Sequence, residues 1–171
     1  NKARLGGGIY NEGFGFNTAT LTVNNSTISS NTASDEGGGI FNARTVTVSN
    51  NSTISGNTAS GSGGGISNRL TLTVDNSTIS NNKAISGGGI FSSGTLTVDN
   101  NSTTSGNTAQ EGGGIYNTGQ ATVNNSPITG NTASQFGGGI VNSGSASLNN
   151  STVSGNSAPN GGGIFSASGC A

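Results

Sequence analysis

A four-residue motif, Gly-Gly-Gly-Ile, recurs seven times along this chain and constrains its fold more than any other feature. The successive steps between its isoleucines are 31, 26, 24, 25, 25 and 24 residues, so a unit of roughly 25 residues repeats along the chain. Such a period indicates a solenoid, in which each unit packs only on its neighbours. The seven isoleucines are Ile9, Ile40, Ile66, Ile90, Ile115, Ile140 and Ile164.

The one long step lies in the first unit, where six extra residues separate Ile9 from the next apolar segment. We place this insertion at about residues 12–17, with Phe14 and Phe16 in it, and expect a loop that leaves the solenoid at a turn.

Each unit contains three short segments in which apolar and polar residues alternate and β-branched residues predominate. In the first full units these are the anchor segment at Ile40, the segment Val46-Thr47-Val48 and the segment Ser52-Thr53-Ile54-Ser55. Alternation with a period of two predicts β-strands, and the glycines exclude helices. The fold class is therefore all-β: a right-handed parallel β-helix, a single solenoid over residues 1–171 with about six to seven coils and three strands per coil.

The amino-acid composition excludes several classes of function. Only 6% of the residues are charged and the net charge is −1, so there is no basic surface for nucleic acid. No apolar run is long enough for a transmembrane segment. Glycine accounts for 32 of the 171 residues, which would suit a disordered chain if the strict period did not override it. The single cysteine, Cys170, forms no internal disulfide and is interpreted as a tail thiol or an intermolecular link.

Asparagines occupy three columns at the expected corners. One column follows the first strand, one precedes the third strand, and one closes it. Asparagine tolerates bent backbone, and its amide can bond an identical residue one coil away, so we interpret the columns as structural. The predicted ladder at the third corner comprises Asn31, Asn57, Asn82, Asn107, Asn131 and Asn156.

The stretch Ile54-Ser55-Gly56-Asn57-Thr58-Ala59, followed by Gly63-Gly64-Gly65-Ile66, resembles the paired repeat motifs of polymorphic outer-membrane proteins and of bacterial surface adhesins. The resemblance recurs in every unit. It implies a passenger or stalk outside the cell, often adhesive. The chain departs from the usual pattern in having isoleucine where an aromatic residue commonly precedes Ser-Gly-Asn.

Two outward columns are candidate ligand sites. Threonines on the second strand would form a flat, uncharged face like those of β-helical ice-binding proteins, although threonine is also simply a good outward strand residue. These are Thr20, Thr22, Thr45, Thr47, Thr71, Thr73, Thr95, Thr97 and Thr122. The residue after each anchor isoleucine forms an aromatic stripe, which is either exposed for sugar or partner binding, or else turned inward by a bend or partly covered by the insertion. Its aromatic members are Tyr10, Phe41, Phe91, Tyr116 and Phe165.

Catalysis has little support in the sequence, and we expect no enzyme, no metal site and no cofactor. There is no histidine. Asp75 and Asp99 occupy equivalent positions of consecutive coils, a spacing that could serve acid–base chemistry or hold a calcium ion, but we interpret the pair as part of a solvated face. Sequons of the form Asn-x-Ser/Thr recur and would carry glycans in a suitable host. They begin at Asn24, Asn25, Asn51, Asn76, Asn101 and Asn150, among others.

The expected function is that of an extracellular or cell-surface structural or adhesive β-helix. The chain starts and stops in the same phase of the repeat without a capping segment, so we expect a segment of a longer rod or a subunit that stacks into filaments. The expected partners are the same solenoid or another copy, and glycans or a host surface. The alternatives are an ice-binding protein that uses the threonine face, and a carbohydrate-binding or carbohydrate-active β-helix.

Overall fold

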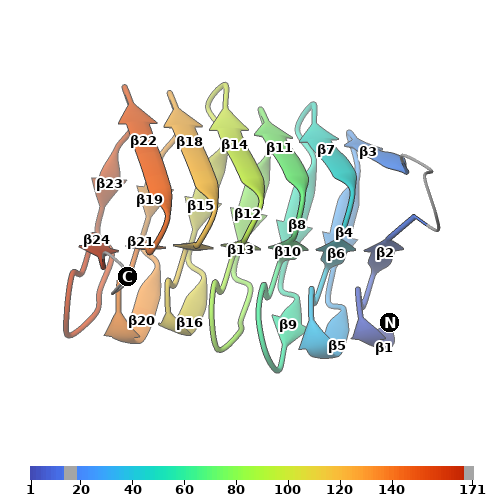
Figure 1. Cartoon of the computed structure of the whole chain (residues 1–171), viewed down its shortest axis with the longest axis horizontal. Coiled ribbons are helices and arrows are strands. Elements are labelled where there is room, and N and C mark those ends of the chain that lie inside the picture. The colour runs from blue at the N-terminus through green and yellow to red at the C-terminus, as the bar shows by residue number, and fades with distance from the viewer. Residues whose placement is uncertain (14–18, 168–171) are drawn as a thin grey trace.

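The structure is a computed structural model that describes residues 1–13 and 19–167. It is a parallel β-solenoid of about six turns, whose coils stack side by side along the long axis (Figure 1). All strand pairs join equivalent residues of consecutive coils, so the predicted repeat and fold class are confirmed. Of the predicted insertion, residues 14–17 lie outside the described residues.

Three sheets run the length of the solenoid, as the three segments of each unit predict. The anchor sheet begins each strand at the repeated isoleucine and comprises β2 (Ile9–Asn11), β6 (Ile40–Asn42), β10 (Ile66–Asn68), β13 (Ile90–Ser92), β17 (Ile115–Asn117), β21 (Ile140–Asn142) and β24 (Ile164–Ser166). The threonine sheet comprises β3 (Thr20–Asn24), β7 (Thr45–Ser49), β11 (Thr71–Asp75), β14 (Thr95–Asp99), β18 (Gln120–Asn124) and β22 (Ser145–Asn149). The serine sheet comprises β4 (Thr27–Ser29), β8 (Thr53–Ser55), β12 (Thr78–Ser80), β15 (Thr103–Ser105), β19 (Ile128–Thr129) and β23 (Val153–Ser154).

A fourth, interrupted column of strands was not predicted. It lies between the buried corner asparagine and the glycine triplet, along the lower edge of the solenoid in Figure 1. Its strands are β1 (Lys2–Leu5), β5 (Thr32–Glu36), β9 (Thr58–Ala59), β16 (Thr108–Glu111) and β20 (Thr132–Phe136). Isolated bridges at Lys83 and Ser157 continue it where no strand forms. The segments in this column differ in length from coil to coil, and register shifts in two of its strand pairs accommodate the difference.

The core is a stack of aliphatic side chains supplied by the three long sheets. Ile66, Leu72, Val74 and Ile79, from one coil, are fully buried, and their equivalents in neighbouring coils lie directly above and below. Because alternate residues of a strand point to opposite faces, the same alternation that places these residues inside places threonine and serine outside. A separate small cluster of Ala33, Ala59 and Ala84 packs inside the fourth column.

Glycine triplets let the fourth column fold tightly against the anchor sheet. A Cβ on Gly64, the middle glycine of its triplet, would lie 2.4 Å from the carbonyl oxygen of Gly88 and 2.5 Å from that of Lys83. The first glycine of each triplet adopts positive φ, as at Gly63 (φ 66°). Backbones of neighbouring coils therefore approach closely at the glycine triplets.

One core position carries a hydroxyl. Thr104 lies in the serine sheet, in register with Ile79 and Ile128, and is fully buried. Within residues 1–13 and 19–167, its Oγ1 is a buried side-chain oxygen with no hydrogen-bond partner. A buried hydroxyl without a partner costs free energy because it has lost its bonds to water.

We expect Thr104→Val to raise the free energy of unfolding by about 1 kcal/mol, since valine keeps the β-branched shape and removes the unpaired hydroxyl. Chemical denaturation of the two proteins measures the difference. Thr103→Val, on the outward side of the same strand, is the control and should change stability by less than about 0.5 kcal/mol. Destabilisation by Thr104→Val relative to this control would contradict the prediction.

Candidate functional surfaces

The threonine face is built as the sequence predicts. Parallel pairing places Thr20, Thr45, Thr71 and Thr95 in one row, which Gln120 and Ser145 continue. The second row contains Thr22, Thr47, Thr73, Thr97 and Thr122 and ends at Ser147. All nine threonines are exposed or half-buried, whereas the residues between them point into the core. Hydroxyls therefore recur about every 4.8 Å between coils and about 7 Å along each strand.

These threonine hydroxyls are free to bind solvent. Backbone carbonyls of this face accept from ladder asparagines, as at Thr45, Thr71 and Thr95. None of the nine side-chain hydroxyls forms a hydrogen bond with another described residue. The face is also free of charge except at one margin, where Asp75 and Asp99 end their strands. This geometry presents an ordered, uncharged array of hydroxyl groups to water.

The aromatic column does not form a continuous exposed stripe. Tyr10 is 47% exposed, Phe41 is 3% exposed, and Phe91, Tyr116 and Phe165 are half-buried. The column is interrupted by two buried residues, Ser67 and Val141. Of the two interpretations left open by the sequence, neither holds for the whole column.

The rings in this column stack on one another along the solenoid axis. Tyr10 and Phe41 are nearly parallel, with centroids 5.2 Å apart, and Phe91 and Tyr116 stack at 5.6 Å. Phe165 instead contacts Phe136 of the fourth column at 4.7 Å. Ring faces that are occupied by neighbouring rings are unavailable for stacking on a sugar, so this packing favours a structural role.

Charged residues cover the most buried ring. The Arg69 guanidinium lies 5.1 Å from the centre of the Phe41 ring and donates to Glu36 Oε1 at 2.8 Å. Glu36 Oε2 also accepts a hydrogen bond from the Ser67 hydroxyl at 2.9 Å. Glu36 belongs to the fourth column, so this contact fastens that column to the anchor sheet. Sequence reasoning missed it because residues from three strands converge only in the folded corner.

The Tyr10 side chain forms a hydrogen bond at the start of the insertion. Its hydroxyl donates to the carboxylate of Glu12, which raises the pKa of Tyr10 above its ordinary value, with smaller contributions from desolvation and from the Glu12 charge. Arg44 donates to the carbonyl of Gly13 at 2.7 Å. The insertion is thus attached to the solenoid near its first residues, while Phe14 and Phe16 lie outside the described residues.

Two of the three asparagine columns form buried amide ladders. At the closing corner, Asn57 donates through both its backbone N–H and its Nδ2 to Asn82 Oδ1, and Asn82 repeats the pattern to Asn107. The predicted ladder Asn31, Asn57, Asn82, Asn107, Asn131 and Asn156 is present. A second ladder joins Asn11, Asn42 and Asn68 in the anchor sheet. Stacked identical amides satisfy polar groups that the corner buries.

The remaining asparagine column, which precedes the serine sheet, forms no such ladder. Its members are exposed and adopt positive φ, as at Asn25 (φ 45°) and Asn51 (φ 62°). An amide ladder was therefore wrong for this column, which is structural through its backbone. The buried ladder at this corner is made by serines that the sequence analysis missed. Backbone N–H groups donate to the hydroxyl of the next coil's serine along Ser26, Ser52, Ser77 and Ser102.

The acidic pair Asp75 and Asp99 lies at equivalent positions, in register and half-exposed, as expected. Asn100 Nδ2 donates to Asp75. The part of the chain that the structure describes contains no group of three or more histidine, cysteine, aspartate or glutamate side chains placed to hold a metal ion.

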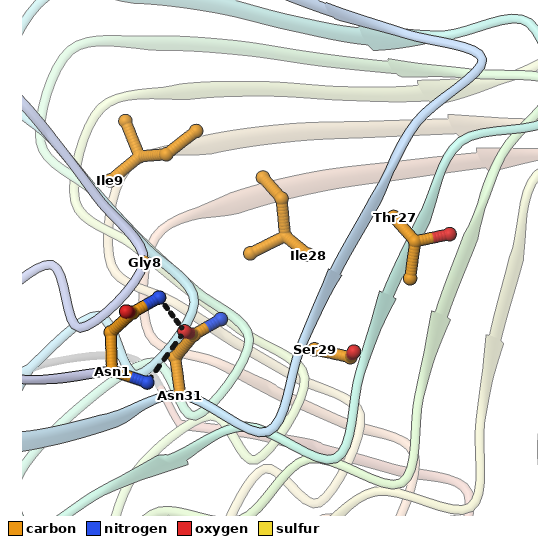
Figure 2. A pocket seen from close by; sticks show the side chains of 7 residues that line it. All are labelled: Asn1, Gly8, Ile9, Thr27, Ile28, Ser29 and Asn31. Atoms are coloured by element: carbon orange, nitrogen blue, oxygen red, sulfur yellow. Dashed lines mark hydrogen bonds between the residues drawn. The ribbon is translucent and has the colours of Figure 1, made fainter.

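The surface of the described residues is hollowed in at least two places. One is the open first coil, where Ile9 and Ile28 of the core face the end of the solenoid (Figure 2). There the amino terminus and Nδ2 of Asn1 donate to Asn31 Oδ1, extending the amide ladder by one member. The other lies over the fourth column beside Lys83 and Ile85, where the strand is replaced by isolated bridges. Ile85 is 46% exposed there.

Residues 1–13 and 19–167 contain no helix of the length and hydrophobicity needed to cross a membrane. Two stretches of the chain, residues 25–43 and 51–69, match the family model of the Chlamydia polymorphic membrane protein repeat. Each stretch runs from the turn before the serine sheet, through the buried corner asparagine and the glycine triplet, to the anchor strand. No curated protein and no solved structure matches the chain. In these repeats and in its parallel β-solenoid fold, the chain resembles the repeat regions of polymorphic membrane proteins.

Proposed function

We propose that this chain is part of an extracellular or cell-surface β-helix whose role is structural or adhesive. The observation that carries the proposal is the distribution of residues between the inside, the corners and the outside of the solenoid. Buried ladders and the aliphatic stack account for the inward and corner residues, and regular, nearly uncharged polar columns cover the outside. The match of two units to a polymorphic membrane protein repeat supports a location at the outer membrane or cell surface.

The proposal includes no catalytic activity. Support comes from the half-exposed setting of Asp75 and Asp99 on a regular outward column, since catalytic groups typically lie in concave sites. Carbohydrate-active enzymes of this fold class would also need a base or acid partner near such a pair. Assays on acidic polysaccharides should therefore show no turnover, and measurable turnover that depends on Asp75 would contradict this part.

Exposure on intact cells tests the surface location. Antibodies raised against the purified chain should label unpermeabilised cells of the source organism as strongly as permeabilised ones. Beads coated with the chain should then be retained on a host-cell layer more than beads coated with an unrelated solenoid. Labelling that requires permeabilisation would contradict the location, and equal retention would contradict the adhesive role.

We also propose that the solenoid extends by pairing its open edges, either with further coils of the same protein or with another copy. The first and last coils leave core residues partly uncovered, namely Ile9, Leu21, Val153 and Ile164. Unpaired edges of this kind favour association. Sedimentation at increasing concentration should show growing particles, and a single monomeric species throughout would contradict association between copies.

Ice binding is the second candidate function, supported by the in-register threonine hydroxyls that carry no protein hydrogen bond. If the threonine face binds ice, the purified protein should show thermal hysteresis that Thr73→Tyr abolishes, because a bulky ring in the middle of the array disrupts its flatness. Thr78→Tyr, at an outward position of the serine sheet, should leave the hysteresis unchanged. Absence of both thermal hysteresis and ice shaping in the unmodified protein would dismiss this function.

A further inference from the structure

The exposed asparagine column that precedes the serine sheet is unlike every other asparagine column in the solenoid. Its members are Asn25, Asn51, Asn76, Asn101, Asn125 and Asn150, and all six are exposed at positive φ. None of their side-chain amides bonds another described residue, whereas the buried ladder asparagines use theirs fully. Six unengaged amides thus stand in one line along an edge of the rod.

Five of these six asparagines begin an Asn-Ser-Thr sequon. They are Asn25, Asn51, Asn76, Asn101 and Asn150, while Pro127 occupies the threonine position after Asn125. The ladder asparagines lack the motif, since alanine stands two residues after Asn31, Asn57, Asn82, Asn107, Asn131 and Asn156. The motif is therefore confined to asparagines that the fold leaves at the surface. Among the described residues, no buried asparagine begins a sequon.

The asparagine immediately before this column also begins a sequon in several coils, of the form Asn-Asn-Ser. These side chains are engaged. Asn50 Nδ2 donates to Asn24 Oδ1 at 2.8 Å, and Asn149 donates to Asn124 at 2.8 Å. Asn100 donates to Asp75. The fold therefore distinguishes two neighbouring rows of potential acceptors: side chains of one row form hydrogen bonds through Nδ2 or Oδ1, whereas those of the exposed column form none with the described residues.

We propose that Asn25, Asn51, Asn76, Asn101 and Asn150 form a row of acceptor sites for N-linked sugar. The donor is a nucleotide-activated or lipid-linked sugar and the catalyst is a transferase that recognises Asn-x-Ser/Thr. A bond forms between the side-chain Nδ2 and the anomeric carbon, and the bond from that carbon to the phosphate leaving group breaks. The amide gives up one proton to the transferase, so the asparagine becomes a substituted amide without any redox step.

Modification at this row is compatible with the fold. The six amides contribute no side-chain hydrogen bond to the solenoid, and Thr53, the third residue of one sequon, lies on the outward side of its strand. Acceptors in adjacent coils are separated by about one strand spacing, roughly 4.8 Å. Single sugars fit such a row at every coil, while large branched glycans would crowd and occupy fewer sites. This inference is independent of the adhesive and ice-binding proposals.

The test uses the folded, unmodified protein with a sequon-specific N-glycosyltransferase and UDP-glucose. Intact mass should show up to five added hexoses, and peptide mapping should place them on the five Asn-Ser-Thr asparagines. Asn125 and the ladder asparagines should stay unmodified. The denaturation midpoint of the modified protein should equal that of the untreated one.

Two variants provide matched controls. Thr78→Val keeps the β-branched shape and should remove only the hexose at Asn76, reducing the maximum from five to four. Pro127→Thr completes the sequon at Asn125 and should add a sixth site. Addition only after denaturation, transfer to Asn24 or Asn50 in preference to the row, or no transfer at all would each overturn the proposal.

Discussion

Gly64→Ala is expected to cost about 4 kcal/mol or more of the free energy of unfolding. The added Cβ would lie 2.4 Å from the carbonyl oxygen of Gly88 and 2.5 Å from that of Lys83. Neither oxygen is free to move away, because Gly88 O accepts from the Gly65 N–H at 3.1 Å and Lys83 O accepts from the Ala59 N–H at 2.9 Å. Relief of the clash therefore breaks bonds between coils, and chemical denaturation followed by circular dichroism measures the loss.

Gly130→Ala is the matched control for this substitution. Gly130 has φ 63°, and no atom lies within 4 Å of its added Cβ, so alanine suffers only the strain of the left-handed backbone. That strain costs about 1–2 kcal/mol. Equal losses for the two substitutions would show that backbone strain, and not close approach of coils, explains the glycine triplets.

Asn82→Ala is expected to cost about 3–5 kcal/mol, because it leaves several buried groups without partners at once. Asn82 Oδ1 accepts from the backbone N–H of Asn57 at 2.9 Å and from its Nδ2 at 3.0 Å. Asn82 Nδ2 donates to Ile54 O and to Asn107 Oδ1, both at 3.0 Å. Loss of this side chain interrupts the ladder between two coils, and denaturation of the variant measures the cost.

Asn24→Ala provides the control, since Asn24 takes part in an exposed asparagine pair with Asn50. Water replaces an exposed hydrogen bond, so we expect a loss of about 0.5 kcal/mol or less. A cost at Asn82 no greater than at Asn24 would mean that the buried ladder contributes specificity of stacking without contributing stability.

The surfaces differ in how far the sequence predicted them. The threonine face was predicted completely, because strand alternation decides which residues point out and a constant unit length decides which residues align. Thr71 and Thr95 accordingly pair in register. The aromatic column obeys the same alternation, but its exposure depends on Arg69 and on Tyr10 of the neighbouring coil. Those residues meet Phe41 only when neighbouring coils stack along the anchor sheet.

The asparagines show the same contrast, within one residue type, between what the sequence predicted and what only the fold decided. Their composition and spacing predict corners, and all three columns lie at corners. Composition and spacing do not reveal which amides are buried, so the ladder at Asn57 and Asn82 and the free row at Asn51 and Asn76 received the same interpretation, although different residues follow them. The buried serine ladder through Ser52 and Ser77 was hidden for the same reason, because serine reads as an ordinary outward residue.

By itself, the sequence determined the coil length, the strands of the three long sheets, the inward and outward faces and the parallel stacking of this protein. Those properties follow from local backbone preferences and from one repeated period, which act the same way in every unit. Only the tertiary structure decided how the chain reverses at the glycine triplet, which rings stack, which hydroxyl of the core lacks a partner and which asparagines stay free. Each of these depends on atoms about 25 residues away in the next coil or across a folded corner, and a linear pattern does not specify such distances.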